Sequence, residues 1–406
     1  MKFKEVLNKG FMLLLVLSGG GMPFLFERNM MSIALFLFIV FLILFYKSKI
    51  AKPVFQGAVG LTFFSILLLV VTYVFSDGKQ VLLKYGFHLL TFVISILTLV
   101  HFLINRKKEA FIEDLYSVLK LIMFHAILSF FAYFFVSGSL EVIKNPLTNY
   151  ECLTFKKIFF YMPERNEYSF FGLTNCRAQG LFWEPGVLQI FLNFFLFLEL
   201  FVFKKSKWVT ALAVFAVLTT QSTTGLVLLC VLMIAYFWNS IKKNILLIPI
   251  AALLLTPIYY MSKSNVEEKV VGERSTSFAI RYFDLTDGFL LALDYPLTGM
   301  GLDDARYKEI RSESYSSTEG VENTEKGNSN SIIYLMAAVG IPFTVFIIYA
   351  LFKQTVIRKR RGLFMLFFIV SILTEPVLLK PFFMLFVMSG MIVIFKNSTQ
   401  IQLSNS

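Results

Sequence analysis

Apolar segments close to the length that a helix needs to cross a bilayer, roughly 20 residues, recur along most of this chain. The chain is 57% hydrophobic and only 16% charged, whereas a soluble domain of 406 residues needs far more polar surface. The sequence therefore predicts an all-α polytopic membrane protein with about twelve transmembrane helices. We expect them at 11–26, 30–46, 53–75, 81–104, 115–137, 181–203, 208–221, 222–238, 244–261, 331–353, 362–376 and 380–395.

Residues 208–238 form one long apolar run that is interrupted by the polar stretch Thr219–Gly225. A single tilted helix would put the basic clusters that flank this run on opposite sides of the membrane. Two short helices that turn at the polar stretch keep both clusters on the same side. We therefore expect two helices here.

The basic clusters all fall on one side of the membrane in this twelve-helix arrangement. By the positive-inside rule that side is cytoplasmic, so both termini are expected inside. The net charge of +12 then belongs to short cytoplasmic loops, and no nucleic-acid partner is expected. The clusters are Lys2/Lys4/Lys9, Lys47/Lys49/Lys52, 106–108, Lys204/Lys205/Lys207, Lys242/Lys243 and 358–361.

Two long segments, at about 138–180 and 262–328, remain on the external side of a single integral membrane domain that we expect to span residues 1–406. Function in membrane proteins tends to lie where irregular backbone and polar groups gather above the bilayer. The first segment holds Cys152 and Cys176. In an oxidising compartment this pair predicts a disulfide worth about 3 kcal/mol; the alternative is two free thiols.

The stretch Arg177–Gly186 places an arginine and a glutamate, Glu184, just before a strongly apolar helix. Pro185 suits the first turn of that helix, where its missing N–H costs nothing. The positive end of the helix dipole and the Arg177 guanidinium would then face the same volume, which favours a phosphate-binding site. The alternative is an arginine among lipid headgroups and a glutamate that caps a helix.

The second long segment contains an amphipathic helix that begins near Ser275 and is stopped by Pro296. Its Arg281 is either presented to a ligand or paired with Asp284 on the surface. The turn at 296–301 is flexible enough to bring backbone N–H groups close to a ligand, and the polar residues 303–328 are expected to be mobile. The predicted apolar stripe consists of Phe278, Tyr282, Leu285, Phe289 and Ala292.

Taken in this order, the motifs resemble those of the O-antigen polymerase (Wzy-type) and O-antigen ligase superfamily. The resemblance covers residues 170–345. It implies a protein of the bacterial inner membrane that has many membrane helices and a large periplasmic loop late in the chain. Its motifs here are Arg177, Gly180 and Pro185; Thr220 and Ser222; Arg281; Pro296, Gly299 and Gly301; and Ser329-Asn330 ahead of Gly340.

One departure separates the two branches of the superfamily. The ligases resemble one another in carrying His-Asn where this chain has Ser329-Asn330. The three histidines, His88, His101 and His125, all fall within predicted helices far from the loop. The resemblance therefore favours a polymerase, with an O-antigen ligase as the alternative.

The resemblance implies an enzyme that joins oligosaccharide repeat units carried on undecaprenyl diphosphate. One lipid-linked unit is the donor, and the non-reducing end of another is the acceptor. The leaving diphosphate needs fixed cations, and the acceptor hydroxyl needs a base. We assign Arg177 and Arg281 to the diphosphate, and Glu184 to the base or to orienting Arg177. Contacts to sugar or phosphate are expected from Ser329, Asn330 and Tyr282. No metal or other cofactor is expected; membrane lipid and a chain-length regulator are the other candidate partners.

A flippase or transporter of lipid-linked oligosaccharide is the alternative from another functional class. Transporters usually carry ionisable groups near the bilayer midplane. The candidates here are Lys120, His125, and the Glu375 and Lys380 stretch, which the sequence suggests are peripheral. Long external segments with two arginines fit a transferase better.

Overall fold

The residues fall into two compact units. The first comprises Met1–Gly19, Arg28–Glu113 and Ser275–Ser406, and the second comprises Gly20–Glu27 and Asp114–Arg274. Whether the chain is one membrane domain, as the sequence predicts, stays a prediction. A computed structural model describes residues 3–21, 28–47, 50–76, 78, 80–104, 108–144, 151–161, 167–170, 173–243, 275–314 and 328–404.

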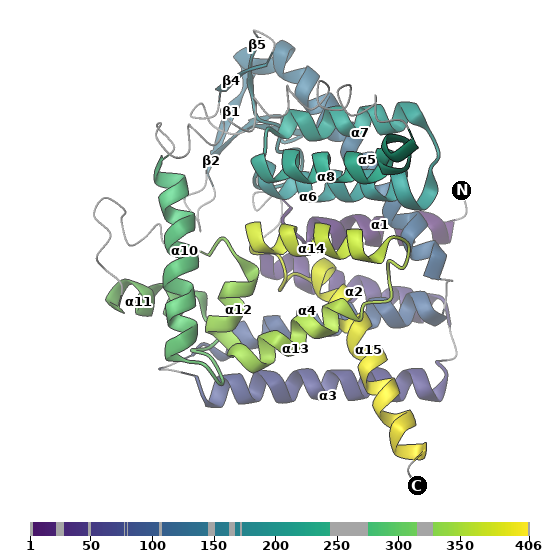
Figure 1. Ribbon diagram of the computed structural model, residues 1–406, viewed down its shortest axis with the longest axis vertical. Coiled ribbons are helices and arrows are strands. Elements are labelled where there is room, and N and C mark those ends of the chain that lie inside the picture. Colours follow the sequence, from purple (N-terminus) through teal and green to yellow (C-terminus); the bar gives the residue numbers. More distant parts are fainter. Residues whose placement is uncertain are drawn as a thin grey trace. The chain divides into compact units, whose positions relative to one another are not determined.

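The regular elements in the described part of the first unit are all helices (Figure 1). Helix α4 contacts α2, α3 and α15, α15 also contacts α13, and α10 packs along α12. The bounds are α1 (Phe3–Leu17), α2 (Arg28–Phe45), α3 (Lys52–Val74), α4 (Leu82–Ile104), α10 (Ser275–Asp294), α11 (Asp304–Ser314), α12 (Ser331–Val339), α13 (Ile341–Phe352), α14 (Arg361–Thr374) and α15 (Pro381–Ser404).

The second unit is built on helix α6, which contacts α7 and α8. Apart from Gly186, every residue of α6 is buried, and the helix continues as a π-helical stretch, η3. A buried carboxylate anchors this stretch: Glu199 accepts hydrogen bonds from the Tyr116 hydroxyl at 2.6 Å and from the Ser206 N–H at 2.7 Å. The helices are α5 (Lys108–Val136, which joins this unit from Asp114 onward), α6 (Pro185–Phe197), η3 (Leu198–Phe203), α7 (Lys207–Thr220) and α8 (Thr223–Lys243).

The first long segment contains β-structure, which corrects the all-α expectation locally. A three-stranded antiparallel sheet has the order β1-β2-β3, and β4 pairs with β5 in a separate hairpin. The alternating polar and aromatic residues of this segment suit strands, but the strands are too short to stand out within an apolar chain. Their bounds are β1 (Glu141–Lys144), β2 (Glu151–Phe155), β3 (Phe159–Tyr161), β4 (Glu167–Phe170) and β5 (Leu173–Cys176).

Within the described residues, five helices are long and apolar enough to cross a membrane. They are Lys52–Val74, Leu82–Leu103, Glu109–Ser139, Pro185–Phe203 and Thr223–Lys243. Shorter apolar helices account for most of the other predicted spans. The 244–261 span lies outside the described residues. The total of twelve transmembrane helices therefore stays a prediction. The first helix begins at Phe3 instead of residue 11.

Two helix breaks shape the units. The predicted turn in the 208–238 run is confirmed, because α7 ends at Thr220 and α8 begins at Thr223. The predicted 331–353 span is instead two helices, because the chain turns at Gly340, whose φ is +82°. Helix ends leave backbone groups without an intrahelical partner, so each break needs partners from elsewhere.

The turn at 296–301 supplies those partners at the Gly340 break. The N–H groups of Met300 and Gly301 donate to the carbonyls of Ala337 and Ala338, at 2.8 and 3.0 Å. These carbonyls belong to the last turn of α12. At the start of α13, the N–H of Ile341 donates to the Pro296 carbonyl at 2.8 Å. The expectation that this turn offers its N–H groups to a ligand is therefore corrected at Met300 and Gly301, whose donors are used within the fold.

Glycine is required at this contact because the two backbones nearly touch. A Cβ added to Gly299 would lie 2.3 Å from the carbonyl carbon of Ala338, and one on Gly340 would lie 2.3 Å from the Leu297 oxygen. Both glycines also have positive φ, which side chains disfavour. The glycines of two separate sequence motifs thus serve one backbone contact.

We expect Gly299→Ala to lower the free energy of unfolding by about 1–3 kcal/mol, because the methyl group clashes with backbone that cannot move aside. Thermal unfolding of the purified protein in detergent measures the change. Gly57→Ala is the control, since a Cβ at Gly57 in α3 meets open space. Equal melting temperatures for the two variants would contradict the docked turn.

Candidate functional site

The predicted site residues divide between the two units. Arg177 and Glu184 belong to the second unit, whereas Arg281, Ser329 and Asn330 belong to the first. Because Arg177 and Arg281 are both assigned to the diphosphate, they are expected to approach one another; this stays a prediction. Each unit nevertheless brings sequence motifs together within itself.

Arg177 lies against the break between α7 and α8. Its Nε donates to the Thr220 carbonyl at 3.1 Å, and its Nη2 donates to the Gln221 carbonyl at 3.3 Å. The adjacent Ala178 N–H donates to the Thr219 carbonyl at 3.1 Å. These carbonyls lie at the end of α7, where no further helical turn can satisfy them. The first and second motifs of the resemblance thus meet, and the guanidinium is held by the backbone.

Glu184 and Pro185 begin helix α6 as the sequence predicts. Glu184 is the extended N-cap residue, and Pro185 occupies the first turn. The carboxylate accepts a hydrogen bond from the Trp183 indole Nε1 at 2.9 Å, while the Trp183 N–H donates to the Gly20 carbonyl at 3.1 Å. The observed partner of Glu184 is therefore this indole, and the roles of base and of Arg177 orienter stay predictions.

Two buried amides on α6 were not predicted. Gln189 and Asn193 are fully buried, and the Asn193 amide donates to the Gln189 side chain and to the Gly225 carbonyl, both at 3.1 Å. A Cβ on Gly225 would lie only 2.8 Å from the Gln189 Cβ, so α8 approaches α6 closely there. The available sequence signal was a polar i,i+4 pair in an otherwise apolar helix. These amides fasten the polar break beside Arg177 to α6.

The predicted Cys152–Cys176 disulfide is not formed in this structure. Cys152 is a free, buried thiol on β2, and it accepts a hydrogen bond from Gln179 Nε2 at 3.2 Å. Burial raises its pKa to about 11, so the thiol stays protonated at neutral pH. Cys176 lies on β5 of the other hairpin, and its side chain is outside the described residues.

We expect Cys152 to react slowly with a maleimide in the folded protein, because its thiol is buried and protonated. Complete labelling should follow denaturation without any reductant. Peptide mass spectrometry measures both steps, and Cys230, a free and partly exposed cysteine of α8, serves as the internal control. Labelling of Cys152 that requires prior reduction would instead establish a disulfide.

The amphipathic helix of the second segment is confirmed as α10, but its buried face differs from the predicted stripe. Tyr282, Leu285 and Phe289 are exposed, at 55, 48 and 43%. The buried positions include Asp284 and Asp287, at 3 and 7% exposure. The helix therefore turns these carboxylates inward and Tyr282, Leu285 and Phe289 outward. Of the other stripe residues, Ala292 is buried as predicted, and the side chain of Phe278 lies outside the described residues.

A buried arginine, Arg311, explains this orientation. Its side chain is fully buried on α11, forms an ion pair with Asp284, and donates from Nε to Asp287 at 2.9 Å. Asp284 is thus the partner of Arg311, which corrects the expected surface pair with Arg281. Residues 304–314 are helical, not mobile as expected. The sequence did not reveal this contact because nothing local indicates that a polar segment folds back onto α10.

The start of α11 is tied to α4 by a second ion pair, Lys84–Asp303. Burial raises the pKa of Asp303, but hydrogen bonds from Lys84 and from the Ala305 N–H outweigh this effect and hold the pKa below its ordinary value. Tyr307 of α11 packs edge-on against Tyr334 of α12. Helix α11 is therefore fixed to the helix bundle, and it holds α10 through Arg311.

Arg281 lies beside a carboxylate that the sequence suggested was peripheral. Its Nη2 is 3.8 Å from the Glu375 Oε1; the Arg281 side chain is 43% exposed and that of Glu375 only 5%. The hydroxyl of Ser331, the first residue of α12, donates to the Glu375 carbonyl at 2.7 Å and accepts from the N–H groups of Val377 and Leu378. Arg281 and the residues that follow α14 thus meet at the start of α12.

The two residues of the polar pair before α12, Ser329 and Asn330, have different surroundings. Asn330 is the N-cap, and its Oδ1 accepts from the N–H groups of Ile332 and Ile333 at 3.0 and 3.1 Å. Ser329 is partly exposed beside it. The Asn330 oxygen is therefore used by the helix, and Ser329 is the member of the pair that is better placed for a ligand.

Comparison with known proteins adds one match. Residues 208–350 match the family model described as O-Antigen ligase. No curated protein and no solved structure matches the chain. The matched region includes four of the five motifs of the resemblance: the α7–α8 break, Arg281, the 296–301 turn, and the Ser329-Asn330 pair ahead of Gly340. This match supports the resemblance to the O-antigen polymerase and ligase superfamily over residues 208–350.

Proposed function

We propose that this protein is a polymerase of surface polysaccharide that joins undecaprenyl-diphosphate-linked repeat units on the external face of the cytoplasmic membrane. The observation that carries the proposal is the placement of two motif arginines: Arg177 lies against the Thr220 break, and Arg281 lies beside Glu375 at the start of α12. Guanidinium matches phosphate bidentately and keeps its charge at a membrane surface. Arg177 and Arg281 would bind the diphosphate and stabilise the charge that develops as it leaves.

The acceptor side of the reaction needs a group that accepts the proton of the attacking hydroxyl. Glu184 remains the candidate base, at the N-terminus of α6. Ser329 and the exposed Tyr282 are candidates for contacts with sugar. The serine at 329 stands where the ligases carry histidine, which supports a polymerase; the description of the matching family keeps an O-antigen ligase as the second candidate.

A deletion strain separates these two activities. Lipid anchors capped with single repeat units are expected if the protein is a polymerase. Long lipid-linked chains that accumulate without reaching their final anchor would identify a ligase and overturn the proposal. Gel profiles and mass spectrometry of the extracted glycans measure the difference.

Arg281→Lys is expected to reduce the rate by about a hundredfold, because a point charge does not reproduce the bidentate contact; this corresponds to about 2–4 kcal/mol. Polymer length in the complemented deletion strain is the measurement. Arg177→Lys should act similarly, but it also removes contacts to the α7–α8 break, so the amount of protein in the membrane must be measured alongside. Full-length polymer from both variants would remove the proposed role of these arginines.

Glu375 is proposed to position the Arg281 guanidinium. Glu375→Gln should therefore slow transfer in the wild-type background, but have little further effect in an Arg281→Ala background. Rates of polymer formation in the four strains give the double-mutant cycle. Glu309→Gln is the control, since Glu309 pairs with Arg306 at an exposed position. Additive losses would show that Glu375 acts independently of Arg281.

A further inference from the structure

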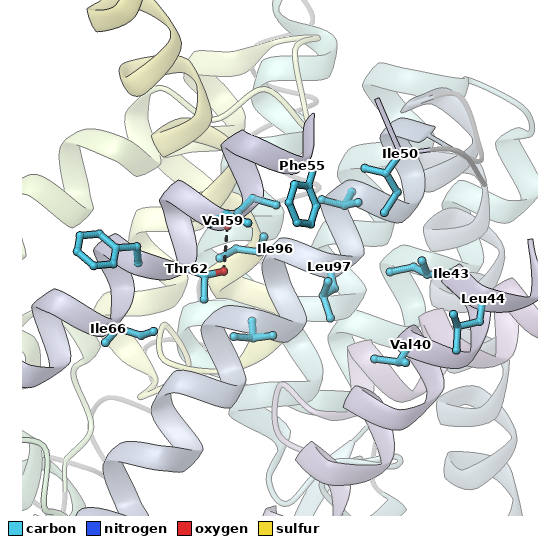
Figure 2. Close-up of a pocket in the computed structure, with 14 residues that line it drawn as sticks. Val40, Ile43, Leu44, Ile50, Phe55, Val59, Thr62, Ile66, Ile96 and Leu97 are labelled. Atoms are coloured by element: carbon cyan, nitrogen blue, oxygen red, sulfur yellow. Dashed lines mark hydrogen bonds between the residues drawn. The ribbon is translucent and has the colours of Figure 1, made fainter. Parts of the chain in front are cut away.

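Two cavities in the first unit lie between helices. The larger, of about 490 Å³, lies between α2, α3 and α4 (Figure 2). Among the described residues that line it, only Thr62 has a polar side chain, and its hydroxyl already donates to the Ala58 carbonyl at 2.9 Å. Nothing in its lining recognises a particular ligand. The cavity offers only hydrocarbon contact.

The second cavity, of about 360 Å³, differs because one edge is polar and basic. Its apolar walls come from α4 and α15, through residues such as Phe102 and Ile392. Its polar edge is formed by Thr355, Arg358 and Ser389. The volume lies within the range of small-ligand pockets, about 300–1,000 Å³. An amphiphile with a polar head and an apolar chain fits this division.

The loop that presents Arg358 is held in shape by a buried amide. Gln354 is 1% exposed; its Nε2 donates to the Ile357 carbonyl at 2.7 Å, and its Oε1 accepts from the Ile357 N–H at 2.9 Å. The Thr355 N–H donates to the Ser389 hydroxyl at 3.3 Å, which fastens the loop to α15. The polar edge is therefore constructed by specific contacts that cross from the loop to a helix.

The close approach of α13 to α15 depends on Gly390, next to Ser389. A Cβ at this position would lie only 1.7 Å from the Ala350 carbonyl oxygen, so a larger residue would push the two helices apart. Gly390 thus keeps α15 near the loop that begins where α13 ends. The geometry of the cavity follows from this packing.

The charge at the edge is positive. Arg358 is the first of four consecutive basic residues, 358–361, and its side chain is exposed. No residue that lines the described cavity carries a carboxylate. Basic pockets between membrane helices on the cytoplasmic side are suited to acidic lipid headgroups, and this loop is one of the predicted cytoplasmic clusters.

We propose that this cavity binds one anionic phospholipid, with the phosphate against Arg358 and an acyl chain between α4 and α15. The phosphate would accept hydrogen bonds from the guanidinium and from the Thr355 hydroxyl at the polar edge. The chain would lie against the apolar walls near Phe102 and Ile392. This lipid site does not depend on the proposed transferase activity.

The test uses the full-length protein reconstituted in phosphatidylcholine, with or without phosphatidylglycerol. Native mass spectrometry measures which lipid stays bound, and thermal unfolding measures stabilisation. The wild type is expected to retain phosphatidylglycerol over phosphatidylcholine by about fivefold or more, with a higher melting temperature in the anionic lipid. Arg358→Ala should abolish this preference.

Arg361→Ala is the matched control, because it removes the same charge from the same basic run without lining the cavity. Its preference should stay near that of the wild type. Equal losses in both variants would mean general surface attraction and would overturn the site, as would a wild type without preference. Ile392→Trp, which fills the apolar wall, should also reduce retention. Full displacement of the lipid by soluble glycerol phosphate would show a phosphate site without a chain, contrary to the proposal.

Discussion

Backbone groups exposed at two helix breaks organise both units of this protein. A helix that ends in an apolar environment leaves carbonyls and N–H groups that must find partners, since each unsatisfied group costs several kcal/mol in lipid. At Gly340 the partners are the backbone of the 296–301 turn. At Thr220 and Gln221 they are the side chain of Arg177 and, one residue earlier, the N–H of Ala178. At both breaks, the contacts join segments that are far apart in the sequence.

These breaks explain why separate motifs belong together. The Pro-x-x-Gly-x-Gly turn and the later Gly340 satisfy each other, and the glycines are needed because the two backbones nearly touch. Arg177 and the Thr-x-Ser stretch form the other pair. The Arg177 guanidinium is thereby held against the α7–α8 break, whereas Arg281 lies beside Glu375 at the start of α12.

Charge pairing then sets the direction of helix α10. Two of its carboxylates face the fully buried Arg311, and this turns Tyr282 and Phe289 outward. Arg281, one turn before Asp284, comes to lie next to Glu375. Burying an arginine with two carboxylates costs desolvation energy. Removing one partner would be strongly destabilising, because it would leave a buried charge without compensation. The ion pairs act together with the buried apolar residues Leu291 and Ala292 of the same helix.

Much of the outline could be predicted from the sequence, because apolar length, basic clusters, Pro185 and the polar stretch at 219–225 act locally. Helices α2, α3, α4, α6 and α10, and the α7–α8 break, follow from such signals. The short strands, the Arg311 ion pairs and the place of Glu375 could not be predicted, since each depends on residues brought together from distant parts of the chain. The disulfide expectation shows the same limit: two cysteines in one segment suggested a bond, but the strands put them in different hairpins and left Cys152 free. Sequence determined which apolar segments are helical and which residues carry charge; tertiary structure decided which charges meet, because that depends on packing between elements.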